Sequence, residues 1–227
     1  MNAIQQNYEL AKIDFQKIGV NTDDALERLS HKSISIHCWQ GDDVTGFEGS
    51  TSLTGGISTT GNYLGKARNA QELMDDLDLA LSLIPGKHRL NLHAMYAITN
   101  GERVDRDVLE PRHFSVWIEY AKERGLGLDF NPTFFSHPKA AGNLTLSSPD
   151  EETRAFWVRH GKACRRIAAD FGRQLGTPSL CNIWIPDGYK DFPADRLTPR
   201  LRLQNSLDEI FTEQFDPTYM IDSVEGK

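Results

Sequence analysis

The feature that most limits the fold of this chain is a regular alternation of strand-like and helix-like segments. Short apolar runs rich in β-branched residues predict strands, and apolar residues recurring every three or four positions predict helices between them. The predicted strands cover residues 33–39, 89–96, 126–132, 178–188 and 219–225. This order requires a parallel sheet with right-handed crossovers, so the fold class is α/β.

Helical patterns precede and separate the predicted strands. Two N-terminal helices are expected over residues 4–18 and 21–29, before the first strand. The later helices are expected to begin at Asn69, Phe114, Ser148 and Thr198 and to end at Pro85, Gly125, Gly176 and Phe215. Asn69 with Glu72, and Ser148 with Glu151, have the spacing of a capping box. The strands are nearly continuous apolar runs, which is typical of strands covered on both faces.

The chain is predicted to form one domain over residues 1–227, because no linker or shift in composition divides it. Successive strand–helix units of this kind are the building blocks of β/α barrels. A closed barrel usually needs about 250 residues, so 227 is short for one. A formal net charge of -7 argues against nucleic acid as a partner.

Cysteine content and the apolar segments indicate where the protein is found. The three cysteines are widely spaced without a CxxC pair, so neither a disulfide framework nor a zinc knuckle is expected. The first residues carry acids and helical periodicity and do not resemble a signal peptide. No segment approaches the roughly 20 apolar residues of a membrane span. We therefore expect a cytoplasmic protein with no membrane partner.

Polar and aromatic residues gather near the carboxyl end of each predicted strand. In chain order they are His37, Trp39 and Gln40, then His93, then Asp129 and Asn131, then Asn182, Trp184 and Asp187, then Glu225 and Lys227. In β/α barrels the carboxyl ends of the strands build the active site, since side chains from different strands converge there. These residues are therefore candidates for one site.

Each candidate also has a structural interpretation. A lone histidine such as His93 is often a hydrogen-bonded core residue, and Asp129 and Asn131 are placed to cap a turn before a proline. An acid in an apolar strand needs a partner. Glu225 either pairs with Lys227, which lies on the same face of the strand two residues later, or ligates a metal.

The glycine-rich segment 41–69 does not form a phosphate-binding loop. Its stretch 61–67 has one residue fewer between its two glycines than the P-loop pattern, and Ala67 stands where Ser or Thr is needed to bind magnesium. A mobile lid or a subunit contact is favoured for this segment instead. No GxGxxG, GxSxG or HExxH motif is present. Cys38 and His37 do not form a dyad easily, because adjacent strand residues point to opposite faces.

The residue types at the strand ends favour a carbohydrate site. Tryptophan faces with scattered amides and carboxylates line sugar pockets, although Trp39 and Trp184 are also compatible with plain barrel packing. Carboxylates with histidine select a divalent ion such as magnesium or manganese, which polarises a sugar carbonyl as aldose–ketose interconversion requires. One acid, Glu225, does not hold a catalytic metal alone, because three or more protein ligands are usual.

Long motifs then identify a family. Residues 37–48, 53–69, 89–96, 126–138 and 182–191 resemble the N-terminal half of L-rhamnose isomerase, and the likeness extends over essentially the whole chain. The resemblance implies an incomplete TIM-type (β/α) barrel that lacks its C-terminal half. It also implies a cytoplasmic tetramer with divalent metals, commonly Mn2+, that converts L-rhamnose to L-rhamnulose by a metal-assisted hydride shift in L-rhamnose catabolism.

Residue by residue, the resemblance places Trp39, His93, Trp184 and Lys227 in the substrate-binding pocket and makes Glu225 a metal ligand. It assigns no catalytic residue in this half, and the other metal ligands lie on strands that the chain lacks. An alternative hypothesis is a catalytically inactive fragment that acts at most as a sugar-binding or assembly partner. A third is another sugar isomerase or epimerase of similar barrel type.

Overall fold

Five parallel strands form a single sheet in a computed structural model that describes residues 2–39, 41–48, 64–140, 142–189 and 191–226. The strands are β1 (Ser33–His37), β2 (Lys87–His93), β3 (Gly127–Asn131), β4 (Ser179–Ile185) and β5 (Met220–Gly226). Each strand pairs with the next one along the chain, in the order β1-β2-β3-β4-β5. The parallel α/β prediction is confirmed. The sheet is open in the described part of the chain, with β1 and β5 at its edges.

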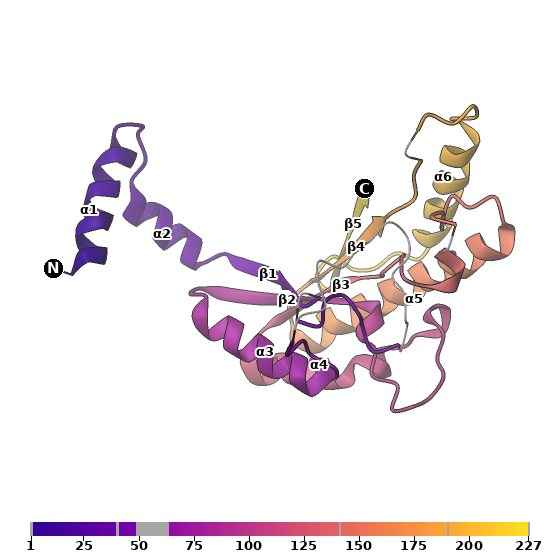
Figure 1. Ribbon diagram of the computed structural model, residues 1–227, viewed down its shortest axis with the longest axis horizontal. Coiled ribbons are helices and arrows are strands. Elements are labelled where there is room, and N and C mark those ends of the chain that lie inside the picture. The colour runs from indigo at the N-terminus through magenta and orange to yellow at the C-terminus, as the bar shows by residue number, and fades with distance from the viewer. Residues whose placement is uncertain (1, 40, 49–63, 141, 190, 227) are drawn as a thin grey trace.

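In the described ranges, one α-helix follows each of the first four strands. These are α3 (Ala70–Leu83), α4 (Ser115–Arg124), α5 (Glu151–Leu175) and α6 (Thr198–Ile210). Short 3-10 turns lie in the connections: η1 (Ala94–Tyr96), η2 (Arg106–Val108), η3 (Pro111–Phe114) and η4 (Pro138–Ala140). Figure 1 shows α3, α4 and α5 on one side of the sheet and α6 beside α5. This is the arrangement that right-handed crossovers produce.

The two faces of the sheet differ in chemistry. On one face Phe130 of β3 packs edge-on against Phe114 and Phe171, with ring centroids 5.0 and 5.4 Å away. Successive strand residues alternate between faces, and paired residues of parallel strands share a face. The opposite face, called here the open face, therefore carries Arg89, Asn91, His93, Asp129, Asn131, Asn182, Trp184, Ser223 and Glu225.

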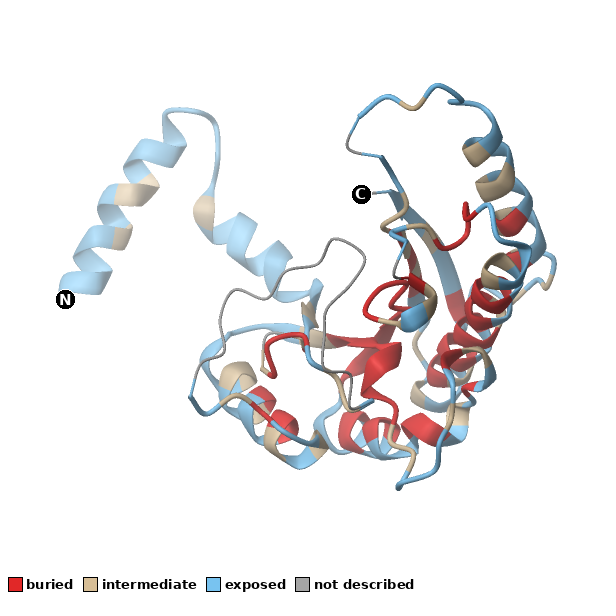
Figure 2. Cartoon of the chain, turned by 45° about the vertical axis from the view of Figure 1, so that its right-hand side comes forward, coloured by how far each residue is buried: buried red, intermediate tan, exposed pale blue. Residues whose placement is uncertain are grey.

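The prediction that all strands are covered on both faces is wrong for the two edges. β2 and β3 are largely buried, whereas Ile34 of β1 is 50% exposed and Ile221 of β5 is 47% exposed. Figure 2 shows burial concentrated in the central strands and α5. An edge strand has a neighbour on one side only, so its apolar residues remain accessible.

The start of α3 follows its predicted capping residue, but the expected reciprocal contact is displaced. Asn69 caps the helix, and its side chain accepts the N–H of Glu72 at 3.0 Å. The carboxylate of Glu72 accepts from the backbone N–H of Arg68 at 2.8 Å, not from that of Asn69. The Arg68 guanidinium also pairs with Glu72, and this ion pair holds the carboxylate at Arg68 instead of at the backbone N–H of Asn69.

Several other element ends differ from prediction; α6, for example, ends at Ile210 and not at Phe215. The N-cap of α5 is Asp150, which accepts the N–H of Thr153 at 2.8 Å, whereas Ser148 was expected in this role. Ser148 instead accepts the N–H of Asp150 at 3.2 Å. Asp is as good an N-cap as Ser, so the sequence offers two suitable capping residues, Ser148 and Asp150, and does not decide between them. β2 ends at His93, because the next three residues turn into η1.

The N-terminal helices form a hairpin that stands apart from the sheet in Figure 1. They are α1 (Ala3–Gln16) and α2 (Thr22–Ser30), and neither contains a buried residue. Asp23 links them, accepting from the Tyr8 hydroxyl at 2.7 Å and from Lys12 at 2.6 Å. Among helices of the described ranges, none combines the length and apolar content needed to cross a membrane.

Candidate functional site

Three of the predicted site residues meet at the carboxyl ends of their strands. Trp39 follows β1, His93 ends β2, and Trp184 lies near the end of β4. The Trp39 ring stacks on His93 with centroids 4.7 Å apart and meets Trp184 edge-on at 6.4 Å. Convergence of strand ends thus places these side chains together. Their role in binding sugar stays a prediction.

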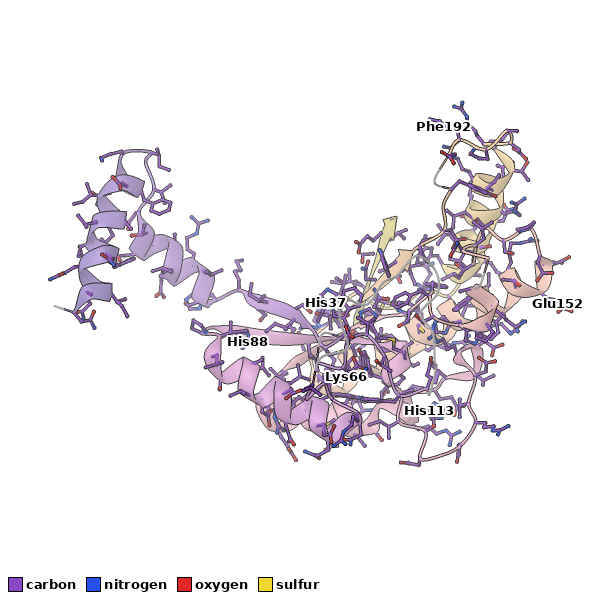
Figure 3. All side chains as sticks on the ribbon, viewed as in Figure 1. His37, Lys66, His88, His113, Glu152 and Phe192 are labelled. Atoms are coloured by element: carbon purple, nitrogen blue, oxygen red, sulfur yellow. The ribbon has the colours of Figure 1, made fainter. Side chains whose placement is uncertain are left out.

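Two further rings join this group. His37, at the end of β1, stacks on Trp39 at 5.2 Å, and Figure 3 shows it where side chains crowd around the strand ends. Phe135 contacts Trp184 at 5.3 Å and His93 at 6.3 Å. These five residues are called here the aromatic cluster. Sequence reasoning missed Phe135, whose only signal was the Phe-Phe pair just after the third strand.

His93 is the most deeply buried polar member of the aromatic cluster. Its side chain has no solvent exposure, and burial lowers its pKa to about 3, with His37 and Arg106 adding smaller effects. The imidazole is therefore neutral near pH 7. Its Nδ1 lies 3.4 Å from the Thr133 hydroxyl, while its Nε2 has no partner among the described residues. A buried ring nitrogen needs a hydrogen-bonding partner, and a ligand hydroxyl is a suitable one.

The buried neutral state of His93 predicts a pH dependence of folding. The pKa rises from about 3 in the folded chain to its ordinary value of 6.5 on unfolding. Below pH 6.5 the unfolded state binds a proton that the folded state does not, so stability falls as pH falls. The expected contribution approaches about 1.4 kcal/mol per pH unit between pH 6 and 3.

Urea unfolding at several pH values, on the parent chain and on His93→Gln, measures this contribution. The variant should lose part of the acid-side slope, and His31→Gln on the exposed hairpin should retain it. Equal slopes for the parent and His93→Gln would contradict a buried, neutral His93.

Asp129 does not cap a turn. Its carboxylate accepts from Arg89 of β2 at 2.8 and 3.0 Å, from the Ser35 hydroxyl of β1 at 2.6 Å, and from the N–H of Leu180 in β4 at 2.9 Å. One buried carboxylate thereby joins four neighbouring strands. Its partners are 40 or more positions away in sequence, so the expected local turn was wrong.

Two other polar residues at strand ends shape the loops. Asn131 accepts the N–H of Thr133 at 3.0 Å, so the turn interpretation of Asn131 is confirmed. Asp187 accepts the backbone N–H and hydroxyl of both Thr145 and Ser147 at 2.5–2.8 Å. It therefore holds the segment before α5 against the end of β4. These contacts account for both side chains without a ligand.

Glu225 lies on the open face of β5 and is exposed. Its carboxylate accepts from the Asn182 amide at 2.7 Å, and the Asn182 carbonyl accepts from the Ser223 hydroxyl at 2.7 Å. Partial burial lowers the pKa of His37, and the negative charge of Glu225 opposes that shift, so Glu225 acts electrostatically on the aromatic cluster. Lys227, its predicted neighbour in the pocket, lies outside the described residues, as does Gln40.

The described residues do not complete a metal site. Across the ranges that the structure describes, no group of three or more His, Cys, Asp or Glu side chains is placed to hold an ion. Glu225 supplies one exposed carboxylate, which suits a single position in the oxygen-rich shell of Mn2+ or Mg2+. These residues therefore fit one ligand and not a whole coordination sphere.

The glycine-rich segment is anchored beside the aromatic cluster at both described ends. Asp42 accepts from the Tyr96 hydroxyl at 2.7 Å and from the N–H of Gly46 at 2.6 Å, and burial raises its pKa. The N–H of Ala67 donates to the Gly41 carbonyl at 2.7 Å. The predicted lid or subunit contact falls mainly on residues 49–63, which lie outside the described ranges.

Cysteine chemistry is not part of the site. Cys38, Cys164 and Cys181 are all buried and unpaired with one another. Burial raises the pKa of each thiol, so none is a ready nucleophile. This agrees with the expectation that Cys38 and His37 do not form a catalytic dyad.

The fold and the site together place the chain in a class, the α/β proteins with parallel strands, in which the carboxyl ends of the strands are the common place for a ligand site. The model of the L-rhamnose isomerase (RhaA) family matches residues 2–227, so the chain belongs to that family. The resemblance found in the sequence is thereby confirmed.

Individual curated relatives support the same family assignment. The chain is 58% identical to L-rhamnose isomerases of Yersinia pseudotuberculosis, Mannheimia succiniciproducens and Yersinia pestis, over 227, 228 and 227 residues. Each alignment covers 100% of this chain and 54% of the relative. The chain thus spans about half the length of the curated relatives it matches.

Proposed function

We propose that the aromatic cluster is the sugar-binding wall of an L-rhamnose isomerase, an enzyme that interconverts L-rhamnose and L-rhamnulose. The observation that carries the proposal is the stacking of Trp39 on His93 beside Trp184, with a buried His93 nitrogen that has no partner among the described residues. Membership of the family supports the choice of sugar and reaction.

The chemistry of each side chain suits that role. Indole faces cover the apolar C–H surface of a sugar, while polar atoms nearby take its hydroxyls. His93 is neutral at physiological pH, so it offers a hydrogen bond without adding charge to the pocket. Phe135 contacts both His93 and Trp184 and adds an apolar ring to this wall. These residues bind and orient the sugar.

We also propose that Glu225 is one ligand of a divalent ion, Mn2+ being the expected one. Such an ion, when bound, polarises the oxygens of the sugar carbonyl and its neighbouring hydroxyl. The support is the exposed carboxylate of Glu225 on the open face, near the aromatic cluster. Because the described residues offer one ligand, no proton or hydride step is assigned to them.

The barrel type, the cellular location and the oligomeric state of the protein are proposals as well. The sequential parallel order of β1 to β5, with helices on one face and polar residues on the other, supports part of a TIM-type (β/α) barrel. Three unpaired cysteines support a reducing cytoplasm. A tetramer is proposed from the family resemblance alone.

A second candidate is that these 227 residues bind the sugar without converting it, or assist the assembly of a longer enzyme. Glu225 is the one candidate metal ligand that the described residues offer, which favours this second candidate, because a catalytic metal usually has three or more protein ligands. A third is isomerisation of a related sugar, and assays with L-mannose and D-allose test it.

The experiment is to purify the chain with Mn2+ and measure ketose formation and binding, using L-rhamnose. Binding with sustained turnover supports the isomerase, whereas binding without turnover supports the second candidate. His93→Ala is expected to weaken binding roughly tenfold through loss of one buried hydrogen bond. His31→Ala, on the exposed hairpin, is the matched control and should bind as the parent does. Unchanged affinity in His93→Ala would refute the proposed site.

A further inference from the structure

Arg106 is a buried charged residue that the proposed chemistry does not use. It lies in η2, between β2 and α4, and its side chain is 2% exposed. We propose that Arg106 is a positioning residue, which fixes the loop after β3 so that Thr133 and Phe135 hold the aromatic cluster in its binding geometry. The inference rests on the proposed function of that cluster.

The guanidinium joins two loops. It donates to the Glu48 carboxylate through Nε and Nη2, at 2.8 and 2.6 Å, in the loop after β1. It also donates to backbone carbonyls in the loop after β3: Thr133 at 2.5 Å, Phe135 at 2.6 Å and Ser136 at 3.1 Å. A planar, permanently charged group with five donors is suited to hold several acceptors at fixed angles.

The loop after β3 has a conformation that needs such support. Thr133 and Ser136 have φ angles of 61° and 52°, in the left-handed region that residues other than glycine seldom adopt. In this conformation three carbonyls of the loop face the Arg106 cation. Loss of the cation would leave three carbonyls without this donor, and the strained backbone would lose the hydrogen bonds that Arg106 gives it.

Two contacts carry the effect from the loop to the aromatic cluster. The Thr133 hydroxyl lies 3.4 Å from His93 Nδ1 and 3.3 Å from the Asn131 carbonyl, so its position influences which His93 nitrogen carries the proton. The Phe135 ring lies between His93 and Trp184. Among the described residues, Arg106 donates to the Glu48 carboxylate and to backbone carbonyls of the loop after β3, that of Phe135 included, and not to a ring of the aromatic cluster.

The test compares the parent chain with Arg106→Met and Arg106→Lys, using Arg159→Met as control. Arg159 pairs with Asp107 on the surface near the same turn, and its side chain is 56% exposed. Far-UV circular dichroism establishes folding, 15N imidazole shifts report the His93 tautomer, and calorimetry gives the affinity for L-rhamnose.

In folded Arg106→Met, the His93 shifts should change and affinity should fall roughly tenfold to a hundredfold, the scale of a misplaced binding group. Arg106→Lys should be intermediate, because an ammonium reaches Glu48 but not all the carbonyls. Parent-like His93 shifts in a folded Arg106 variant would overturn the inference. If Arg106→Met does not fold, the lysine variant decides in the same way.

The same measurements separate this inference from the proposed function. A parent chain that does not bind L-rhamnose contradicts the proposed function, while the His93 shifts still decide whether Arg106 positions the cluster. An equal change in Arg159→Met would also overturn the inference, since it would show a general effect of removing a cation.

Discussion

Replacing Asp129 by alanine is expected to lower the free energy of unfolding by about 3–5 kcal/mol, as removing one partner of a buried ion pair does. The Asp129 side chain is 4% exposed and the Arg89 side chain is 16% exposed. The carboxylate also accepts from Ser35 and from the N–H of Leu180, so its loss loosens four strands at once. Urea unfolding followed by circular dichroism measures the change.

A surface acid provides the control for Asp129. Asp14 pairs with Lys17, and both side chains are mostly exposed, at 73% and 69%. Asp14→Ala should therefore change stability by about 0.5 kcal/mol or less. The double variant Arg89→Met/Asp129→Leu should recover much of the loss, because no charge is left buried alone. If Asp129→Ala lowers the free energy of unfolding by less than about 1 kcal/mol, the carboxylate does not hold the four strands together.

The second large effect is expected at Gly172, where α5 passes the chain leading into β5. A Cβ at this position would lie 1.8 Å from the backbone oxygen of Tyr219 and 2.6 Å from its carbonyl carbon. Backbone atoms cannot move aside as a side chain does, so Gly172→Ala should cost about 2–3 kcal/mol through overpacking. β5 should shift with Tyr219, and Glu225 would move with it.

Gly161 of the same helix is the matched control. Its added Cβ would meet the end of the Ile210 side chain at 2.7 Å, and that side chain can rotate away. Alanine also favours the helix by about 1 kcal/mol over glycine, so Gly161→Ala should stay within about 1 kcal/mol of the parent. If Gly172→Ala proves as mild as Gly161→Ala, α5 and β5 do not approach as closely as described.

Much of the fold was predictable because it is set by local signals. Periodicity and β-branched runs identify all five strands and the helices between them, and glycines at Gly125 and Gly176 end α4 and α5 in the left-handed conformation. Exposure of the edge strands was not predictable in this way, because it depends on which strand has a neighbour. The first residue of α5 was missed for a different reason, since Ser148 and Asp150 are both competent caps.

The candidate site was predictable only in part. The meeting of Trp39, His93 and Trp184 follows from the rule that parallel strands end at one edge of the sheet. Phe135 and Arg106 were not predictable, because their positions depend on a loop with left-handed residues and on contacts about thirty residues apart in sequence. Periodicity carries no information about either.

Four tryptophans allow the most direct test of the central claim, that the carboxyl ends of the strands form one sugar site. Trp39 and Trp184 belong to the aromatic cluster, while the indole N–H groups of Trp117 and Trp157 donate to the Tyr96 and Lys139 carbonyls at 2.9 and 3.1 Å. In a titration with L-rhamnose followed by 15N indole resonances, the first two should shift and the last two should not. Shifts confined to Trp117 and Trp157, or no shift at any tryptophan up to saturating sugar, would contradict the account.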